Sequence, residues 1–203
     1  MARLKEPSAP TQPPPVLTDD DLRSIFSTTR ADRSFLGVRD YAMLMVLADS
    51  GMRVGELVGM TMDDIDFDNG TVEVLGKGRR RRFAAIGPRT ARSLLAYFRS
   101  RAKHPAAEST NRVWIGQRGA LRESSVWETV KKRGEDAGVK GVFPHLFRHT
   151  FAHRFRLQGG QEGDLASLGG WRSTEMLRRY GASAASERAV EAHRRIDHLG
   201  NVL

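Results

Sequence analysis

Residues suited to chemistry on a phosphate ester gather in the last third of the chain. His145 and Arg148 are three positions apart, so on a helix they share one face, and Pro144 suits the first turn of that helix. Histidine can move a proton near neutral pH, and the planar guanidinium fork of arginine fits phosphate oxygens. Tyr180 follows downstream as a possible nucleophile. Because the pKa of tyrosine is about 10, that role requires cationic surroundings and a proton acceptor.

Three further motifs flank this set. Residues 50–56 read Ser-Gly-Met-Arg-Val-Gly-Glu, residues 76–78 read Gly-Lys-Gly, and residues 168–171 read Leu-Gly-Gly-Trp, with Trp171 nine positions before Tyr180. In this order the motifs resemble those of the tyrosine recombinases, the phage-integrase and Xer group, over roughly residues 17–193. His-x-x-Arg alone is common by chance, but five motifs in register over this span are specific.

The resemblance implies DNA strand cleavage and rejoining by transesterification. Tyr180 would attack a DNA phosphodiester and form a 3′-phosphotyrosyl bond, while a 5′-hydroxyl leaves and later attacks from a partner strand. Arg53 and Arg148 would neutralise the nonbridging oxygens as charge builds up in the transition state. The implied catalytic residues are Arg53, Lys77, His145, Arg148, Trp171 and Tyr180.

The resemblance also implies roles for the remaining motif residues. Lys77 would protonate the leaving 5′-oxygen, and His145 would assist proton transfer at the nucleophile. Glu56 would hold the site in place, although an isolated Arg-x-x-Glu is usually a surface ion pair of little energetic value. Many relatives have histidine where this chain has Trp171, and indole donates one hydrogen bond but cannot transfer protons. We therefore expect Trp171 to pack and to make one phosphate contact.

Other charged residues lie near these motifs. The run Arg79, Arg80, Arg81 and Arg82 is expected to bind DNA by following its phosphates. His149 and His153 lie off the face shared by His145 and Arg148, so we expect both to be structural or surface residues.

Composition limits the class of protein and its partners. The chain has 203 residues and a formal net charge of +9, which favours a polyanion and, beside phosphate-chemistry motifs, double-stranded DNA. The absence of cysteine excludes disulfides and cysteine-ligated metals. No acidic cluster indicates a metal, and a covalent protein–DNA link would store the bond energy, so we expect no cofactor. With no long apolar run and no signal peptide, we expect a cytoplasmic, DNA-associated protein without membrane contact.

The predicted fold class is α+β, mainly helical, with a small three-stranded antiparallel sheet over residues 65–86. Asn69-Gly70 predicts a hairpin turn, and Lys77 is expected at the tip of the second turn. Thr18, followed by three aspartates, predicts a helix start. Further helices are expected around residues 41–47, from residue 88, over residues 124–137, 144–157, 161–168 and 174–179, and at the C-terminus over about 183–197.

The predicted domains are a flexible, proline-rich arm or linker over residues 1–16 and a catalytic domain over residues 17–203. Family members usually carry a separate helical core-binding domain before the catalytic one, for which this chain has no room. A catalytic fragment and a natural single-domain protein both stay open. The resemblance also implies self-association as a tetrameric synapse on DNA, with the C-terminal helix docked either on its own domain or on a neighbouring copy.

Two other functions remain open at the level of sequence. A type IB-like topoisomerase would use the same chemistry but religate the original strand. A non-catalytic DNA-binding regulator derived from an integrase would bind DNA without cutting it. A nicked duplex that traps a covalent adduct, tested for sequence dependence, distinguishes the three.

Overall fold

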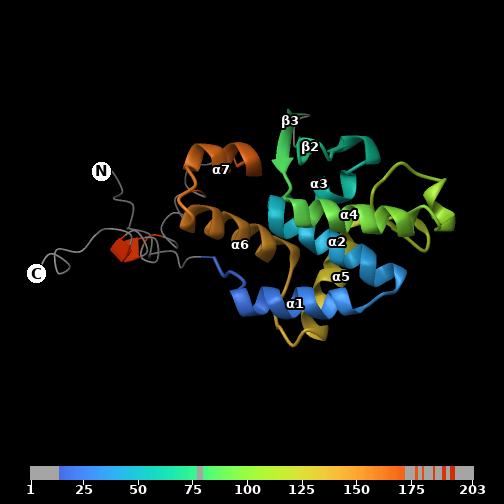
Figure 1. The fold of residues 1–203 in the computed structure, drawn as a ribbon, viewed down its shortest axis with the longest axis horizontal. Helices are drawn as coiled ribbons and strands as arrows, with labels where there is room; N and C mark the ends of the chain where they lie inside the picture. Colours follow the sequence, from blue (N-terminus) through green and yellow to red (C-terminus); the bar gives the residue numbers. More distant parts are fainter. Residues whose placement is uncertain are drawn as a thin grey trace, which may run out of the picture.

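The computed structural model describes residues 14–76 and 80–171, together with Leu177, Tyr180, Ala185, Ala189, Val190, His193 and Arg194. Lys77 and Arg79 lie outside the described residues, as do most of the helices predicted over residues 174–179 and 183–197. The described part confirms the predicted class, because it is mainly helical with a small three-stranded antiparallel sheet (Figure 1).

Helix α2 (Phe35–Ser50) lies at the centre of the packing. It contacts α1 (Asp19–Ala31), α4 (Pro88–Arg101), α5 (Glu123–Asp136) and α6 (Pro144–Leu157). Residues on several sides of α2 are buried, as expected for a helix surrounded by others. It ends at Gly51, whose φ of 58° lies in the left-handed region that suits a glycine at a helix end.

The predicted cap of α1 is confirmed. The Thr18 hydroxyl accepts a hydrogen bond from the Asp21 amide at 3.1 Å, and the Asp21 carboxylate accepts one from the Thr18 amide at 2.9 Å. This reciprocal pair satisfies two amide groups that helix geometry leaves without partners. A buried ion pair that the sequence did not indicate ties α5 to α2, since Arg133 Nε donates to Asp40 at 2.9 Å.

The sheet has the predicted meander topology. Its strands are β1 (Ile65–Asp66), β2 (Thr71–Gly76) and β3 (Arg80–Ala85), paired in that order. Gly70 occupies the first turn with a φ of 62°. The sheet packs against the short helix α3 (Val54–Gly59) through β2 and against α7 (Glu162–Gly169) through β3. Figure 1 shows α7 above α6 and next to the end of the sheet.

The remaining elements are short. They are the 3-10 turns η1 (Met62–Asp64) and η2 (Pro105–Ala107) and the two-residue strands β4 (Ile115–Gly116) and β5 (Gly119–Ala120). Next to β4, the buried Trp114 stacks on Tyr97 of α4 with ring centroids 5.4 Å apart.

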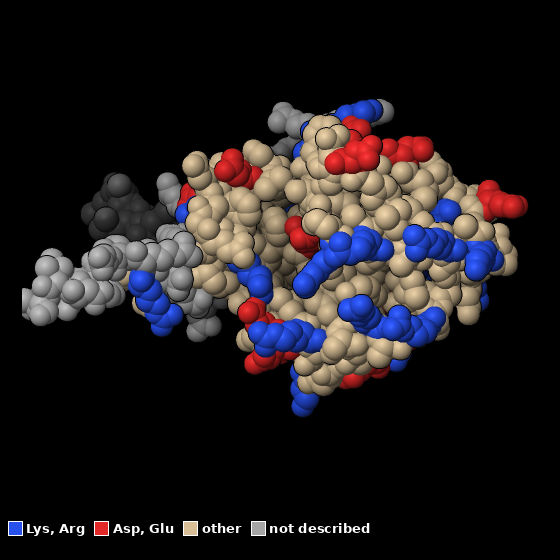
Figure 2. All heavy atoms as spheres, viewed as in Figure 1, with Lys and Arg blue, Asp and Glu red and all other residues tan. Residues whose placement is uncertain are grey.

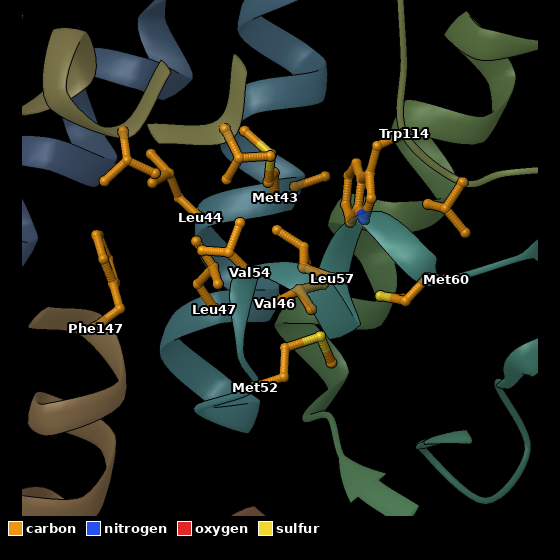
Figure 3. Close-up of a cluster of buried hydrophobic side chains, with 14 of the residues drawn as sticks. Met43, Leu44, Val46, Leu47, Met52, Val54, Leu57, Met60, Trp114 and Phe147 are labelled. Atoms are coloured by element: carbon orange, nitrogen blue, oxygen red, sulfur yellow. The ribbon is translucent and has the colours of Figure 1, made fainter. Parts of the chain in front are cut away.

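The apolar interior divides into two clusters. The larger one lies among α1 to α6 and includes Leu44, Leu47, Leu57 and Trp114 (Figure 3). The smaller one joins one side of α6 to α7 and to the segment beyond it, and its buried members are Ala152, Leu165, Trp171, Leu177 and Tyr180. The tyrosine proposed from sequence as the nucleophile therefore belongs to the smaller cluster.

Lysine and arginine side chains are spread over the surface formed by α1 and α4 (Figure 2). A groove between these helices is lined by Arg30, Arg33, Arg89 and Arg92 together with the half-buried Tyr41. Among the described residues, no helix is both long and apolar enough to cross a membrane.

Candidate active site

Three arginines from three elements converge on the C-terminal end of α7. Each donates a hydrogen bond to a different one of three consecutive carbonyl groups. The pairs are Arg82 Nη1 with Leu168 at 2.6 Å, Arg148 Nη2 with Gly169 at 2.8 Å, and Arg53 Nη2 with Gly170 at 3.0 Å. The last carbonyls of a helix lack partners within it and carry its partial negative charge, so they favour cations. We call Arg53, Arg82 and Arg148 the arginine cluster.

The two glycines at this helix end are required by its geometry. Gly170 has a φ of 66°, and a Cβ atom placed on it would lie 2.8 Å from Arg82 Nε. A Cβ atom on Gly169 would overlap the ring of Trp171. The Leu-Gly-Gly-Trp motif thus lets the backbone turn sharply while three guanidinium groups approach it.

Glu56 binds two members of the arginine cluster through guanidinium nitrogens other than those that bond the end of α7. Its carboxylate accepts hydrogen bonds from Arg53 Nη1 at 3.0 Å and from Arg82 Nη2 at 2.7 Å. It also accepts one from the Arg53 amide at 2.8 Å, which caps α3. The Glu56 side chain is only 6% exposed, so this is not a solvated surface pair.

Arg148 is the most enclosed member of the cluster. Its Nη1 donates to the carbonyl of Gly51 at 2.6 Å, and its guanidinium carbon lies 3.6 Å from the centre of the Trp171 ring. Stacking on the ring stabilises the cation, and the N–H groups at the edge of the guanidinium plane can still donate hydrogen bonds. Burial, together with the charge of Arg53, lowers the pKa of Arg148 to about 9, so the group remains charged at neutral pH.

Tyr180 is buried against this arrangement, with 1% of its surface exposed. Its ring meets Trp171 edge to face, with centroids 5.6 Å apart, so Trp171 contacts both Tyr180 and Arg148. The Tyr180 hydroxyl oxygen lies 2.6 Å from Nδ1 of His149. The sequence led us to expect a structural or surface role for His149, but its side chain contacts the predicted nucleophile.

His145 lies on the same helix, one turn earlier, and is exposed. Burial of part of the ring lowers its pKa, and the charges of Arg148 and Arg53 lower it further. These neighbours place His145 beside the arginine cluster, where it can meet a phosphate. His153 is buried in α6 one turn beyond His149.

Two side chains of the predicted run of DNA-binding arginines are described, Arg81 and Arg82, and they face opposite sides of the sheet. Arg81 is exposed and pairs with Glu73 across the sheet at 2.7 Å, whereas Arg82 is 12% exposed and belongs to the arginine cluster. Strand alternation explains the difference, because Arg82 faces the same side as its partner Val74, which is buried. That alternation was visible in the sequence and could have indicated an inward role for Arg82.

The site therefore combines groups that suit transfer of a phosphoryl group. Fixed cations can stabilise the charge that grows on the nonbridging oxygens, and their preorganisation by Glu56 and α7 avoids a cost during the reaction. Tyr180 and an imidazole nitrogen are already in hydrogen-bond contact. Lys77, the predicted acid, lies outside the described residues.

The sequence matches the model of the phage integrase family over residues 15–187. It is 33% identical over 174 residues to the tyrosine recombinase XerD of Bifidobacterium longum, covering 79% of this chain and 55% of that protein. It is 32% identical over 204 residues to the tyrosine recombinase XerC of Xanthomonas axonopodis pv. citri, covering 99% of this chain and 61% of that protein. The chain thus spans little more than half the length of these curated relatives.

Solved structures share the fold. The XerA recombinase superimposes with a TM-score of 0.78 at 24% identity, covering 96% of this chain and 68% of that one. The XerH site-specific recombinase, solved bound to its difH substrate, gives a TM-score of 0.74 at 20% identity, covering 84% and 51%. The Tn1549 transposon integrase, solved with transposon end DNA, gives 0.71 at 21% identity, covering 93% and 68%.

Proposed function

The chain belongs to the phage integrase family, and from that premise we propose that it is a site-specific DNA recombinase that cleaves and rejoins strands through a covalent tyrosyl intermediate. The observation that carries this proposal is the arginine cluster packed through Trp171 against Tyr180. A fixed set of cations beside a tyrosine serves phosphoryl transfer, whereas a protein that only bound DNA would need no buried hydroxyl at that place.

In the cleavage step, the Tyr180 oxygen forms a bond to the phosphorus of a DNA phosphodiester and the bond from phosphorus to the 5′-oxygen breaks. The phenol gives its proton to a neighbouring imidazole, and the departing 5′-oxygen gains one from Lys77. Arg53 and Arg148 bind the nonbridging oxygens, and His145 donates a further hydrogen bond to them. Rejoining reverses each transfer with a 5′-hydroxyl as the attacking group, so the phosphate bond energy is conserved without ATP.

The remaining residues support this centre. Glu56 and the end of α7 hold the arginine cluster in place, as their hydrogen bonds indicate. The exposed Arg81 can contact the DNA backbone outside the centre. Residues 17–203 would form the catalytic domain, and residues 1–16 an arm that precedes it.

Strand exchange also sets the number of copies that must cooperate. Each chain carries one Tyr180, and exchange between two duplexes cuts four strands, so the active form would be four copies on paired DNA sites. The segment after Tyr180 would couple one copy to the next. That segment lies largely outside the described residues.

A suicide substrate tests the proposal. A duplex with a nick near the cleavage site loses its short leaving strand after attack, so the covalent protein–DNA adduct accumulates and is seen as a shifted band on a denaturing gel. Tyr180→Phe should give no adduct while retaining its fold and DNA binding, since the substitution removes one hydroxyl and about 1 kcal/mol of hydrogen bonding.

The control is Tyr41→Phe, which removes a hydroxyl from the groove between α1 and α4 and should leave adduct formation unchanged. An adduct that persists in Tyr180→Phe would refute the assignment of the nucleophile. Adduct formation on any duplex, with relaxation of supercoiled plasmid, would favour a topoisomerase over a site-specific recombinase.

A further inference from the structure

We propose that His149 is the catalytic group that accepts the proton of Tyr180 when the tyrosine attacks DNA. The proposal rests on the function proposed above. It starts from the 2.6 Å separation between His149 Nδ1 and the Tyr180 hydroxyl oxygen, which is a short hydrogen-bond distance. The sequence motif instead indicated His145 for this task.

The surroundings hold the two groups in this contact. Tyr180 is 1% exposed and fixed by the edge-to-face contact with Trp171, while His149 projects from the rigid helix α6. The His149 and Tyr180 rings have centroids 5.6 Å apart and are tilted by 41°. Because His149 is already hydrogen-bonded to the Tyr180 hydroxyl, it can accept the proton directly.

The charges around His149 favour the neutral ring that a proton acceptor must be. Burial lowers its pKa, and the charges of His145 and Arg148 on the same helix lower it further. A free histidine binds a proton as the pH falls below neutrality, and His149 does so only at a lower pH than a free histidine. With its own hydrogen on Nε2, the neutral ring presents the Nδ1 lone pair to the Tyr180 hydroxyl.

His145 occupies a different position. It is exposed at the start of α6, where the charges of both Arg148 and Arg53 act on it. That location suits a group that meets the phosphate. His149 therefore acts at the nucleophile, and His145 acts at the nonbridging oxygens of the phosphate.

The proton balance of the step is complete. As the Tyr180 oxygen bonds to phosphorus, its proton moves to Nδ1 of His149 and the ring becomes a cation. The 5′-oxygen leaves with a proton from Lys77, as in the function proposed above. During rejoining the proton returns from His149 to the phenolic oxygen, so the ring ends neutral and ready for another cycle.

Single-turnover cleavage of the suicide substrate by two variants tests this role. His149→Asn places an amide oxygen near the position of Nδ1, so it keeps a hydrogen-bond acceptor but has no basic nitrogen. His149→Ala removes both. We expect both variants to cleave at least about 100-fold more slowly than the parent at pH 7, the usual size of a general-base effect. The deficit should shrink as the pH rises toward 9, because tyrosine then ionises without help.

His153→Asn is the matched control, since it removes another buried histidine one turn further along α6. It should cleave at a rate within a few-fold of the parent, and thermal unfolding measured for all variants verifies that they are folded. His149→Asn at the parental rate, or a deficit that stays constant between pH 7 and 9, would overturn the proposal. Absence of any adduct with the parent chain, or an adduct with Tyr180→Phe, would instead refute the proposed function.

Discussion

Glu56 shows how much a single carboxylate contributes to this site. It accepts three hydrogen bonds, two of them from guanidinium groups, and it is almost fully buried. Arg82 depends on it most, because burial lowers the pKa of Arg82 while the charge and hydrogen bond of Glu56 oppose that effect. Without a negative charge at position 56, two cations would face each other across the site.

We therefore predict that Glu56→Gln lowers the free energy of unfolding by about 1–3 kcal/mol, the cost of weakening buried, charge-assisted hydrogen bonds. Cleavage of the suicide substrate should slow by more than tenfold, because Arg53 loses its fixed position. Chemical denaturation and single-turnover assays measure the two effects. Glu73→Gln is the control. Because Glu73 pairs with the exposed Arg81, this substitution should change the free energy of unfolding by less than about 1 kcal/mol. Equal effects from both substitutions would contradict the role of Glu56.

Among the elements, α7 has the largest influence on the site for its length. Its last two residues and the capping Gly170 present the three carbonyls that hold the arginine cluster. Gly170 also allows the chain to turn so that the Trp171 ring stacks on Arg148. The site thus depends on how the helix ends as well as on which side chains it carries.

The corresponding prediction compares two glycines of the same element. Gly170→Ala should lower stability by about 1–2 kcal/mol, because alanine resists a φ of 66°, and its methyl group would also displace Arg82. Cleavage should fall sharply. Gly163→Ala lies in the helix with open space around its Cβ position and should be neutral or slightly stabilising. Thermal unfolding and adduct formation report on both, and normal cleavage by Gly170→Ala would show that the exact turn is unimportant.

The elements themselves were largely predictable from sequence, and the contacts between them were not. The Thr18 cap, the Asn69-Gly70 turn and the end of α2 at Gly51 are local features that short-range rules describe. The pairing of His149 with Tyr180, and of Arg82 with Glu56, joins residues 31 and 26 positions apart. Such contacts depend on how α6 packs against the segment after α7 and how β3 packs against α3, which no local pattern in one sequence specifies.

For the molecule as a whole, the dominant property is positive charge. The net charge is +9, and lysine and arginine side chains are spread over the face formed by α1 and α4 (Figure 2). This basic surface includes arginines outside the arginine cluster, namely those that line the groove between these helices and the exposed Arg81. DNA binding by this chain should therefore be governed by phosphate contacts more than by base contacts.

We predict strongly salt-dependent binding with little sequence selectivity for the 203-residue chain alone. Contacts with about five phosphates would reduce the affinity by roughly 500-fold between 50 and 200 mM salt. Fluorescence anisotropy with duplexes of different sequence measures both the slope and the selectivity. Nanomolar, site-specific binding at physiological salt would contradict this expectation.

The burial of Tyr180 bears on how safely such a protein can move over DNA. A hydroxyl in a residue that is 1% exposed cannot meet a phosphate until contacts with DNA open a path to it, with His149 still bonded to the hydroxyl. We expect the combined contacts of a correctly paired complex to open that path more readily than a random encounter with DNA does. Most collisions between this protein and a chromosome would then end without a broken strand.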